Sequence, residues 1–213
     1  MKTALVFVIL AVALSFCGII DRLTGRNSRF DSPANSGVSS SGEPAVSSKG
    51  ETNIIFETPQ PTAAQQAIID GGREFSWDAQ GLKWKLPPNW KKGNEDRYFI
   101  TFMSPDFAVL SANISPLQND FPIDISLKAT YDGDITRMKN GDLETVRYLE
   151  IDGVKGVESI ETSQGKGSPR RHLWIAYRKY AGQLQMLNFI LSGNFDKHRD
   201  DLAAILYSTK IIK

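Results

Sequence analysis

The chain has 213 residues and is almost electrically neutral, with 25 lysines and arginines against 24 aspartates and glutamates. This balance excludes a strongly basic protein, so we expect no nucleic-acid partner. Cys17 is the only cysteine. The rest of the chain therefore holds no cysteine nucleophile, no zinc–thiolate site and no iron–sulfur cluster.

Residues 1–17 have the pattern of a signal peptide or a membrane anchor. A basic residue, Lys2, precedes an apolar segment from Ala4 to Phe16 that only Ser15 interrupts, and Cys17 follows directly. A basic start and an apolar core of this length are typical of a secretory signal. We therefore expect a membrane-anchored protein whose body faces the extracytoplasmic side of the cell envelope.

Three ways of processing this segment remain open. Leu14 and Ser15 resemble the bacterial lipobox, in which Cys17 would carry a diacylglycerol, but Phe16 stands where that pattern has Gly, Ala or Ser. Alternatively, the 17 apolar residues from 4 to 20 form an uncleaved anchor, at the lower limit for spanning about 30 Å of hydrocarbon. In the third alternative, an ordinary signal is cleaved after Ser15.

Residues 18–66 have the composition of a disordered tether. Ser, Gly and Pro fill 13 of the 24 positions between residues 27 and 50. Such a segment buries too little apolar surface to offset the entropy of ordering it. Within the tether, the apolar patch Ile54–Phe56 could dock as an edge segment. We expect the folded domain to comprise residues 67–213.

Hydrophobic periodicity and turn residues predict hairpins and two helices in this domain. The predicted strands are residues 82–86, 97–103, 108–114, 143–151, 154–162, 171–180 and 183–191, with a last edge strand at residues 211–212. Asp152-Gly153 and Ala181-Gly182 predict the turns of two hairpins. An apolar stripe predicts a helix from Ile123 to Met138, and a second helix is expected from Phe195 to Tyr207.

Antiparallel hairpins, with one helix in mid-chain and the other near the C-terminus, predict an α+β fold. Each helix could cover a different face of the sheet. We therefore expect an α/β/α sandwich around an antiparallel sheet.

Four stretches resemble the PsbP-like family and its relatives of the Mog type. They are the strand and turn Gly81–Trp90, the hairpin Ile151–Val157, the strand pair Trp174–Leu191 and the closing helix Leu202–Ile211. The resemblance implies an α/β/α sandwich, usually without catalysis. Known members are accessory proteins that bind larger complexes, including extrinsic subunits of photosystem II, and many bacterial members are lipoproteins. The shared positions are structural and carry over no binding residue.

Basic and aromatic residues at two places predict a binding surface. Trp90 follows a double proline and precedes Lys91 and Lys92, and we expect it to be the most exposed of the four tryptophans. Arg170 and Arg171 form a second basic group. Exposed aromatic and basic side chains are typical of protein-binding surfaces. The alternatives are core packing for the tryptophan and solvated hairpin ends for the arginines.

No constellation in the sequence predicts catalysis, a metal or a cofactor. His172 and His198 are the only histidines, and we expect His198 to lie at a solvated helix start. The polar run from Asp132 to Glu144 lacks the Gly and Glu positions of a calcium loop. No Gly-x-Ser-x-Gly motif occurs.

The sequence therefore favours a non-catalytic, membrane-tethered accessory domain of the cell envelope that binds a protein partner. Two alternatives remain open. One is a carrier of a small or lipid-like ligand, held between a helix and the sheet. The other is a hydrolase that uses His172 or His198 as its base.

Overall fold

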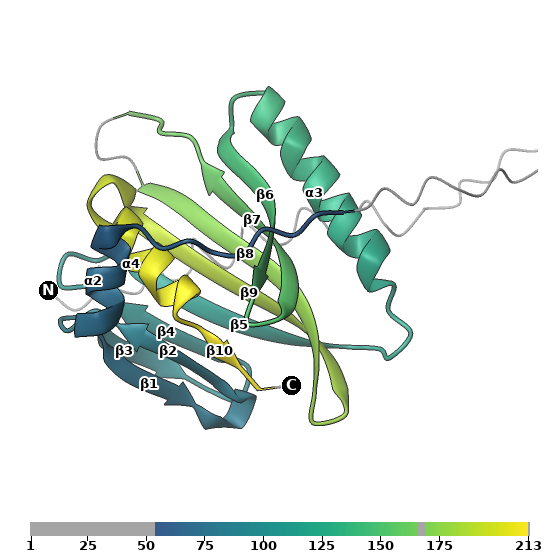
Figure 1. The fold of residues 1–213 in the computed structure, drawn as a ribbon, viewed down its shortest axis with the longest axis horizontal. Helices are drawn as coiled ribbons and strands as arrows, with labels where there is room; N and C mark the ends of the chain where they lie inside the picture. Colours follow the sequence, from purple (N-terminus) through teal and green to yellow (C-terminus); the bar gives the residue numbers. More distant parts are fainter. Residues whose placement is uncertain (1–53, 166–168, 213) are drawn as a thin grey trace, which may run out of the picture. The chain divides into compact units, whose positions relative to one another are not determined.

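The computed structural model describes residues 54–165 and 169–212 (Figure 1). The expected signal or anchor, Cys17 and the tether up to residue 53 lie outside this range. Among the described helices, none is long and apolar enough to cross a membrane.

A seven-stranded antiparallel sheet is the largest element of the fold (Figure 1). Its strands, in spatial order, are β3 (Lys91–Glu95), β4 (Phe99–Met103), β5 (Val109–Leu117), β9 (Gln183–Asn194), β8 (Pro169–Tyr180), β7 (Val154–Glu161) and β6 (Leu143–Ile151). The pairs β4–β5, β6–β7 and β8–β9 confirm the predicted hairpins. Both residues of Asp152-Gly153 and of Ala181-Gly182 have positive φ, between 49° and 79°. Two-residue hairpin turns that match the strand twist require this conformation.

A second, three-stranded sheet has the order β1-β2-β10. It consists of β1 (Arg73–Trp77), β2 (Leu82–Leu86) and β10 (Lys210–Ile211), and the short 3-10 helix η2 (Asp78–Gln80) joins the first two. The predicted strand at residues 82–86 and the closing edge strand are confirmed. Strands β1 and β3 were not predicted, and all five residues of β3 are polar or glycine and exposed.

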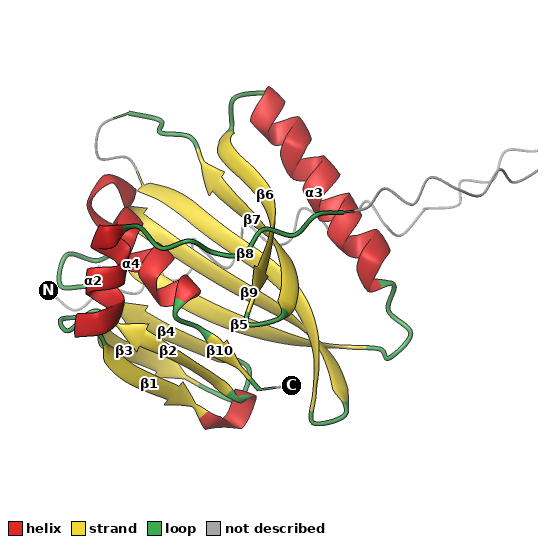
Figure 2. Cartoon of the chain, in the orientation of Figure 1, coloured by secondary structure: helices red, strands yellow, loops and turns green. Residues whose placement is uncertain are grey.

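Helices cover both faces of the large sheet (Figure 2). The α3 helix (Ile123–Lys139) packs on β6 and β7, and its Leu127 joins Val157 and Tyr177 in one apolar cluster. The α4 helix (Phe195–Tyr207) packs on β8 and β9 from the opposite face, and α2 (Ala63–Gly71) packs on α4. The expected α+β fold, with an antiparallel sheet between helices, is confirmed.

The described structure begins ahead of residue 67, where we expected the domain to start. Glu57 forms a parallel bridge with Leu149 of β6 through two backbone hydrogen bonds of 3.0 and 2.9 Å. The α2 helix begins after a capping box in which Thr62 and Gln65 exchange hydrogen bonds. This segment covers the outer edge of β6, which would otherwise present unpaired backbone groups.

One apolar cluster joins the two sheets and α4. Trp84 of the small sheet contacts Phe102 and Phe189 of the large sheet, with ring centroids 5.8 and 5.9 Å apart. Trp174 contacts Phe189 at 5.8 Å, in the tilted geometry that aromatic pairs prefer. This packing fixes α4 on the sheet.

Candidate functional site

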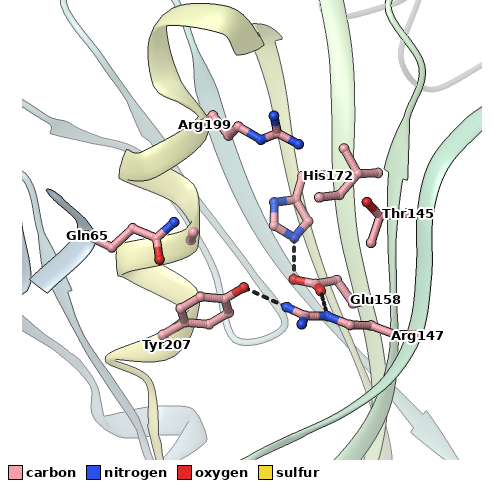
Figure 3. A pocket seen from close by; sticks show the side chains of 9 residues that line it. Gln65, Thr145, Arg147, Glu158, His172, Arg199 and Tyr207 are labelled. Carbon is pink, nitrogen blue, oxygen red and sulfur yellow. Dashed lines mark hydrogen bonds and ion pairs between the residues drawn. The ribbon is translucent and has the colours of Figure 1, made fainter. Parts of the chain in front are cut away.

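A polar cavity of about 240 Å³ lies between α4 and strands β6, β7 and β8 (Figure 3). Nine residues line it: Gln65, Thr145, Arg147, Glu158, Ile160, His172, Arg199, Ala203 and Tyr207. They come from two helices and three strands, so only the folded chain brings them together.

Glu158 is the centre of the hydrogen-bond network in this cavity. It lies on β7 and is 0% exposed. One carboxylate oxygen lies 2.7 Å from His172 Nε2, and the other accepts a hydrogen bond from Arg147 Nε. The two remaining Arg147 nitrogens donate to Tyr207 Oη at 2.8 Å and to Glu57 at 2.9 Å. This hydrogen-bond network therefore links the segment around Glu57, the sheet and α4. Figure 3 shows the contacts inside the cavity.

Opposing effects set the charge of Glu158. Burial favours the neutral acid, but the hydrogen bonds from His172 and Arg147 outweigh burial and hold the pKa of Glu158 below its usual value. Burial and the nearby Glu158 charge raise the pKa of the Tyr207 hydroxyl. At neutral pH the network therefore contains an ionised carboxylate, a protonated guanidinium and a neutral phenol.

His172 is oriented by this carboxylate. Because the ionised Glu158 accepts hydrogen bonds only, His172 Nε2 carries the proton. The other ring nitrogen, Nδ1, is buried and has no hydrogen-bond partner in the described part of the chain. A serine-type triad would place a hydroxyl on that nitrogen. The described residues place none there, so Nδ1 is left without a protein partner.

The expectation that Arg170 forms part of an exposed basic group is wrong. Its side chain is 5% exposed, because it lies against the ring of Phe195, 4.7 Å from the ring centroid. It forms ion pairs with Glu144 and, at 3.5 Å, with Asp196. Arg170 therefore fixes the start of α4 on the sheet.

Trp90 is also buried, at 2% exposure, so its expected exposure is wrong. Its indole nitrogen lies 3.4 Å from a carboxylate oxygen of Asp201, and its ring packs edge-on against His198. His198 was expected at a solvated helix start but is buried as well, with one ring nitrogen 2.8 Å from Asp201 and the other 2.8 Å from Asp106. Both residues support α4 and do not present a binding surface.

Two other predicted residues, Lys91 and Arg171, lie at opposite ends of one row across the large sheet. Lys91 pairs with Met103, Met103 with Val109, Val109 with Ser192, and Ser192 with Arg171. Residues directly opposite one another share a face of the sheet. We call these five residues the open row. They lie on the face that α3 covers over β6 and β7, and Lys91, Met103 and Arg171 are exposed there.

Lys92, the last of the predicted surface residues, alternates to the other side of β3. It is exposed at the sheet edge and forms an ion pair with Glu95 at 2.7 Å. Arg171 is paired as well, with both its backbone N–H and its guanidinium bonded to Glu161. Lys91 has no ion-pair partner among the residues that the structure describes.

Phe107 lies in the turn between β4 and β5, next to the open row, and the sequence analysis did not single it out. It is 72% exposed, and its φ of 69° lies in the left-handed region that bulky side chains rarely adopt. The Ser104 hydroxyl fixes the turn by bonding the carboxylate of Asp106 at 2.8 Å and the backbone N–H of Ala108 at 2.9 Å.

Asp106 anchors the same turn to the first turn of α4. It forms an ion pair with Lys197 and lies 2.8 Å from His198 Nε2. The hydrogen bond from Lys197, together with that from Ser104, holds the pKa of Asp106 well below its usual value. The turn is therefore fixed from both sides, and Phe107 projects from a rigid backbone.

The described residues contain no group of three or more His, Cys, Asp or Glu side chains arranged to hold a metal ion. In the polar run from Asp132 to Glu144, Asp132 is paired with Lys128 on α3 at 2.6 Å. Asp134 is paired with Arg137 at 3.1 Å. These carboxylates are therefore neutralised within the helix.

Comparisons with known proteins give no family. No protein-family model and no curated protein sequence matches the chain. Among solved structures, it is similar to LpqN, described as involved in cell envelope biogenesis of Mycobacterium tuberculosis, with 14% identity, 73% of this chain and 100% of that chain covered, and a TM-score of 0.48. It is also similar to a cyanobacterial PsbP (CyanoP) from Synechocystis, with 16% identity, 67% and 94% covered, and a TM-score of 0.41.

A third similar structure comes from Bacteroides thetaiotaomicron, with 12% identity, 67% of this chain covered and a TM-score of 0.47. The alignment spans about half of that protein, 49% of its length. With TM-scores below 0.5, these likenesses establish neither a shared family nor a shared function. Function has to be argued from the residues.

Proposed function

We propose that the protein is a non-catalytic binding domain, tethered to the extracytoplasmic side of a cell membrane, that docks a protein partner through Phe107 and the open row. The observation that carries this proposal is the exposed Phe107 at positive φ. A bulky residue in this conformation costs free energy of folding, and its exposed ring recovers little of that cost by packing. Rigid exposed aromatic anchors are typical centres of protein interfaces.

The open row indicates which chemical groups the partner would present. Met103 and Val109 continue the apolar surface beside Phe107. Lys91, at one end of the row, has no ion-pair partner among the described residues, whereas Arg171 at the other end is neutralised by Glu161. The partner would therefore offer an apolar recess for Phe107 and a carboxylate that faces Lys91.

The tethered, envelope location is supported by the sequence alone. A basic residue, an apolar run and Cys17 precede a segment rich in Ser, Gly and Pro. Linkers of this composition let a domain search a volume above the membrane and raise the effective concentration of a membrane-bound partner.

Site-specific photo-crosslinking in the envelope fraction tests the proposal. A photoreactive phenylalanine analogue replaces Phe107 or, as the control, Ile125, which is equally exposed but lies on α3. We expect one defined cross-linked product from position 107 and none from position 125. Lys91→Glu should reduce the yield at position 107 at least tenfold, because it places a negative charge opposite the partner's carboxylate. Equal yields at both positions, or no product at either, would contradict the proposal.

A further inference from the structure

The cavity of Figure 3 has the construction of a ligand site that is independent of the docking face. Its lining extends from the exposed Arg199 to Glu158 and His172 in the interior. The cavity therefore runs from the surface into the sheet. Its volume of about 240 Å³ is below the roughly 300–1,000 Å³ of clefts for drug-sized ligands. Any occupant is therefore small.

One atom of the lining has an unmet requirement for a hydrogen bond. His172 is 2% exposed, and its Nε2–H donates to Glu158 at 2.7 Å. Nδ1 has no partner among the described residues. Figure 3 shows this nitrogen on the side of the ring turned away from Glu158 and toward α4. A buried polar atom without a partner is costly, so an occupant that forms a hydrogen bond here is favoured.

The charges around the cavity are already paired. Arg147 donates to Glu158, Glu57 and Tyr207, and Arg199 donates to Glu144. An anion would have to displace one of these partners and approach the carboxylate of Glu158. A cation would meet both guanidinium groups. A neutral occupant avoids both costs.

The remaining lining mixes polar and apolar side chains. Only Ile160 and Ala203 contribute purely apolar side chains. The hydroxyl of Thr145 makes no hydrogen bond to any residue that the structure describes. Such walls suit hydroxyl groups, which both donate and accept, and do not suit an acyl chain.

We infer that this cavity binds a small neutral polyhydroxylated molecule, a polyol or a monosaccharide, one of whose hydroxyls forms a hydrogen bond with His172 Nδ1. Thr145 receives a second hydroxyl. Glu158 and Arg147 act as positioning residues: they hold the Nε2 side of the imidazole, so that Nδ1 is the ring nitrogen left for the ligand.

Titration of the intact protein with glycerol, myo-inositol and glucose tests the inference, with the imidazole ¹⁵N signals of His172 and His198 as the readout. Binding is read at Nδ1 of His172. At least one probe should shift its resonance in a saturable manner, with a Kd in the millimolar range, while the His198 signals stay in place. Inorganic phosphate and palmitate serve as the charged and the apolar probes.

Variants sharpen the same titration. Thr145→Val keeps the side-chain shape and removes one hydroxyl, so the affinity should fall several-fold. Thr136→Val, the same change at an exposed position of α3, should bind as the wild type does. His172→Phe should weaken binding at least tenfold. Because the wild-type shift is read directly, a variant that fails to fold leaves the main result intact.

Two results would overturn the inference: no saturable shift with any of the three hydroxylated probes, or saturable binding of phosphate or palmitate alone. Neither result bears on the docking proposal, because cross-linking at Phe107 does not involve the cavity.

Discussion

The two faces of the seven-stranded sheet distribute polar and apolar groups in opposite ways. On the face under α4, a glutamate, a histidine and an arginine form a buried network around a cavity. On the other face, over strands that α3 does not cover, Met103 is exposed, and Phe107 is exposed in the turn that follows β4. Burying charges and exposing apolar side chains both work against stability. Each face therefore departs from what folding alone requires, and these two places are where we expect binding.

The comparison predicts that the protein loses stability when the network on the face under α4 is broken. Glu158→Ala removes the group that pairs with both Arg147 and His172. We expect the free energy of unfolding to fall by about 2–3 kcal/mol, because the buried Nε2–H of His172 loses its acceptor and Arg147 loses one of its three partners. Chemical denaturation measures the change. As a control, Glu74→Ala removes the surface partner of Lys85 and should cost less than about 1 kcal/mol. Similar losses for the two variants would mean that the network is not a stability element.

The turn that carries Phe107 should depend on the close backbone contact between Gly193 and Ala108. Gly193 has a φ of 136°, and a Cβ added there would lie 2.7 Å from Ala108 Cα, directly after Phe107. We expect Gly193→Ala to cost about 1–3 kcal/mol in thermal or chemical unfolding, because the backbone of the turn has to move.

A matched substitution should have the opposite sign. Gly133 lies within α3, and an added Cβ would meet nothing within 4 Å. Gly133→Ala should therefore raise the free energy of unfolding by about 1 kcal/mol. A loss at Gly133 as large as that at Gly193 would show that general glycine effects, and not the contact with Ala108, set the cost.

Acid should remove the stabilising contribution of Glu158, on the face under α4. The folded-state pKa of Glu158 lies below its unfolded value, so its contribution to stability is present above the unfolded pKa of about 4.3. This contribution is lost as the pH falls from there through the folded-state pKa. Denaturation at a series of pH values measures the slope. Glu158→Gln should have a shallower slope than the wild type below about pH 4.3. An unchanged slope would mean that Glu158 is not ionised in the folded protein.

Phe107→Gly should have the smallest effect on stability. Glycine relieves the unfavourable φ of 69° but adds freedom to the unfolded chain, and the mostly exposed ring loses little packing. We expect the free energy of unfolding to change by less than about 1 kcal/mol. A larger loss in calorimetry would mean that the ring supports the fold and is not reserved for a partner.

The sequence predicts what local patterns encode. Turn dipeptides such as Asp152-Gly153 fix a hairpin, and the apolar spacing from Ile123 onward fixes a helix, since both depend on neighbouring residues. The β3 strand could not be predicted in this way, because it has no apolar residue and only its pairing with β4 makes it a strand. Trp90 looked exposed because two lysines follow it, but contacts with α4, more than a hundred residues later in the chain, bury it.

The candidate sites were harder to predict for the same reason. Glu158 and His172 lie fourteen positions apart and meet only because β7 pairs with β8. Arg147 and Tyr207 are brought together from β6 and α4. Lys91 and Arg171 were identified from their charge, yet their place on one row depends on the order of five strands. Phe107 gave no signal, because its significance lies in a backbone angle and in its exposure.

A comparison of partner capture by the wild type and by Phe107→Gly tests the central claim most directly. Wild type, Phe107→Gly and the control Ile125→Gly are each used to isolate cross-linked complexes from the envelope fraction, after calorimetry has shown that all three are folded. If Phe107 anchors a protein partner, one complex is recovered with the wild type and with Ile125→Gly and is lost with Phe107→Gly. Recovery of the same complex in equal yield with all three proteins would contradict the account.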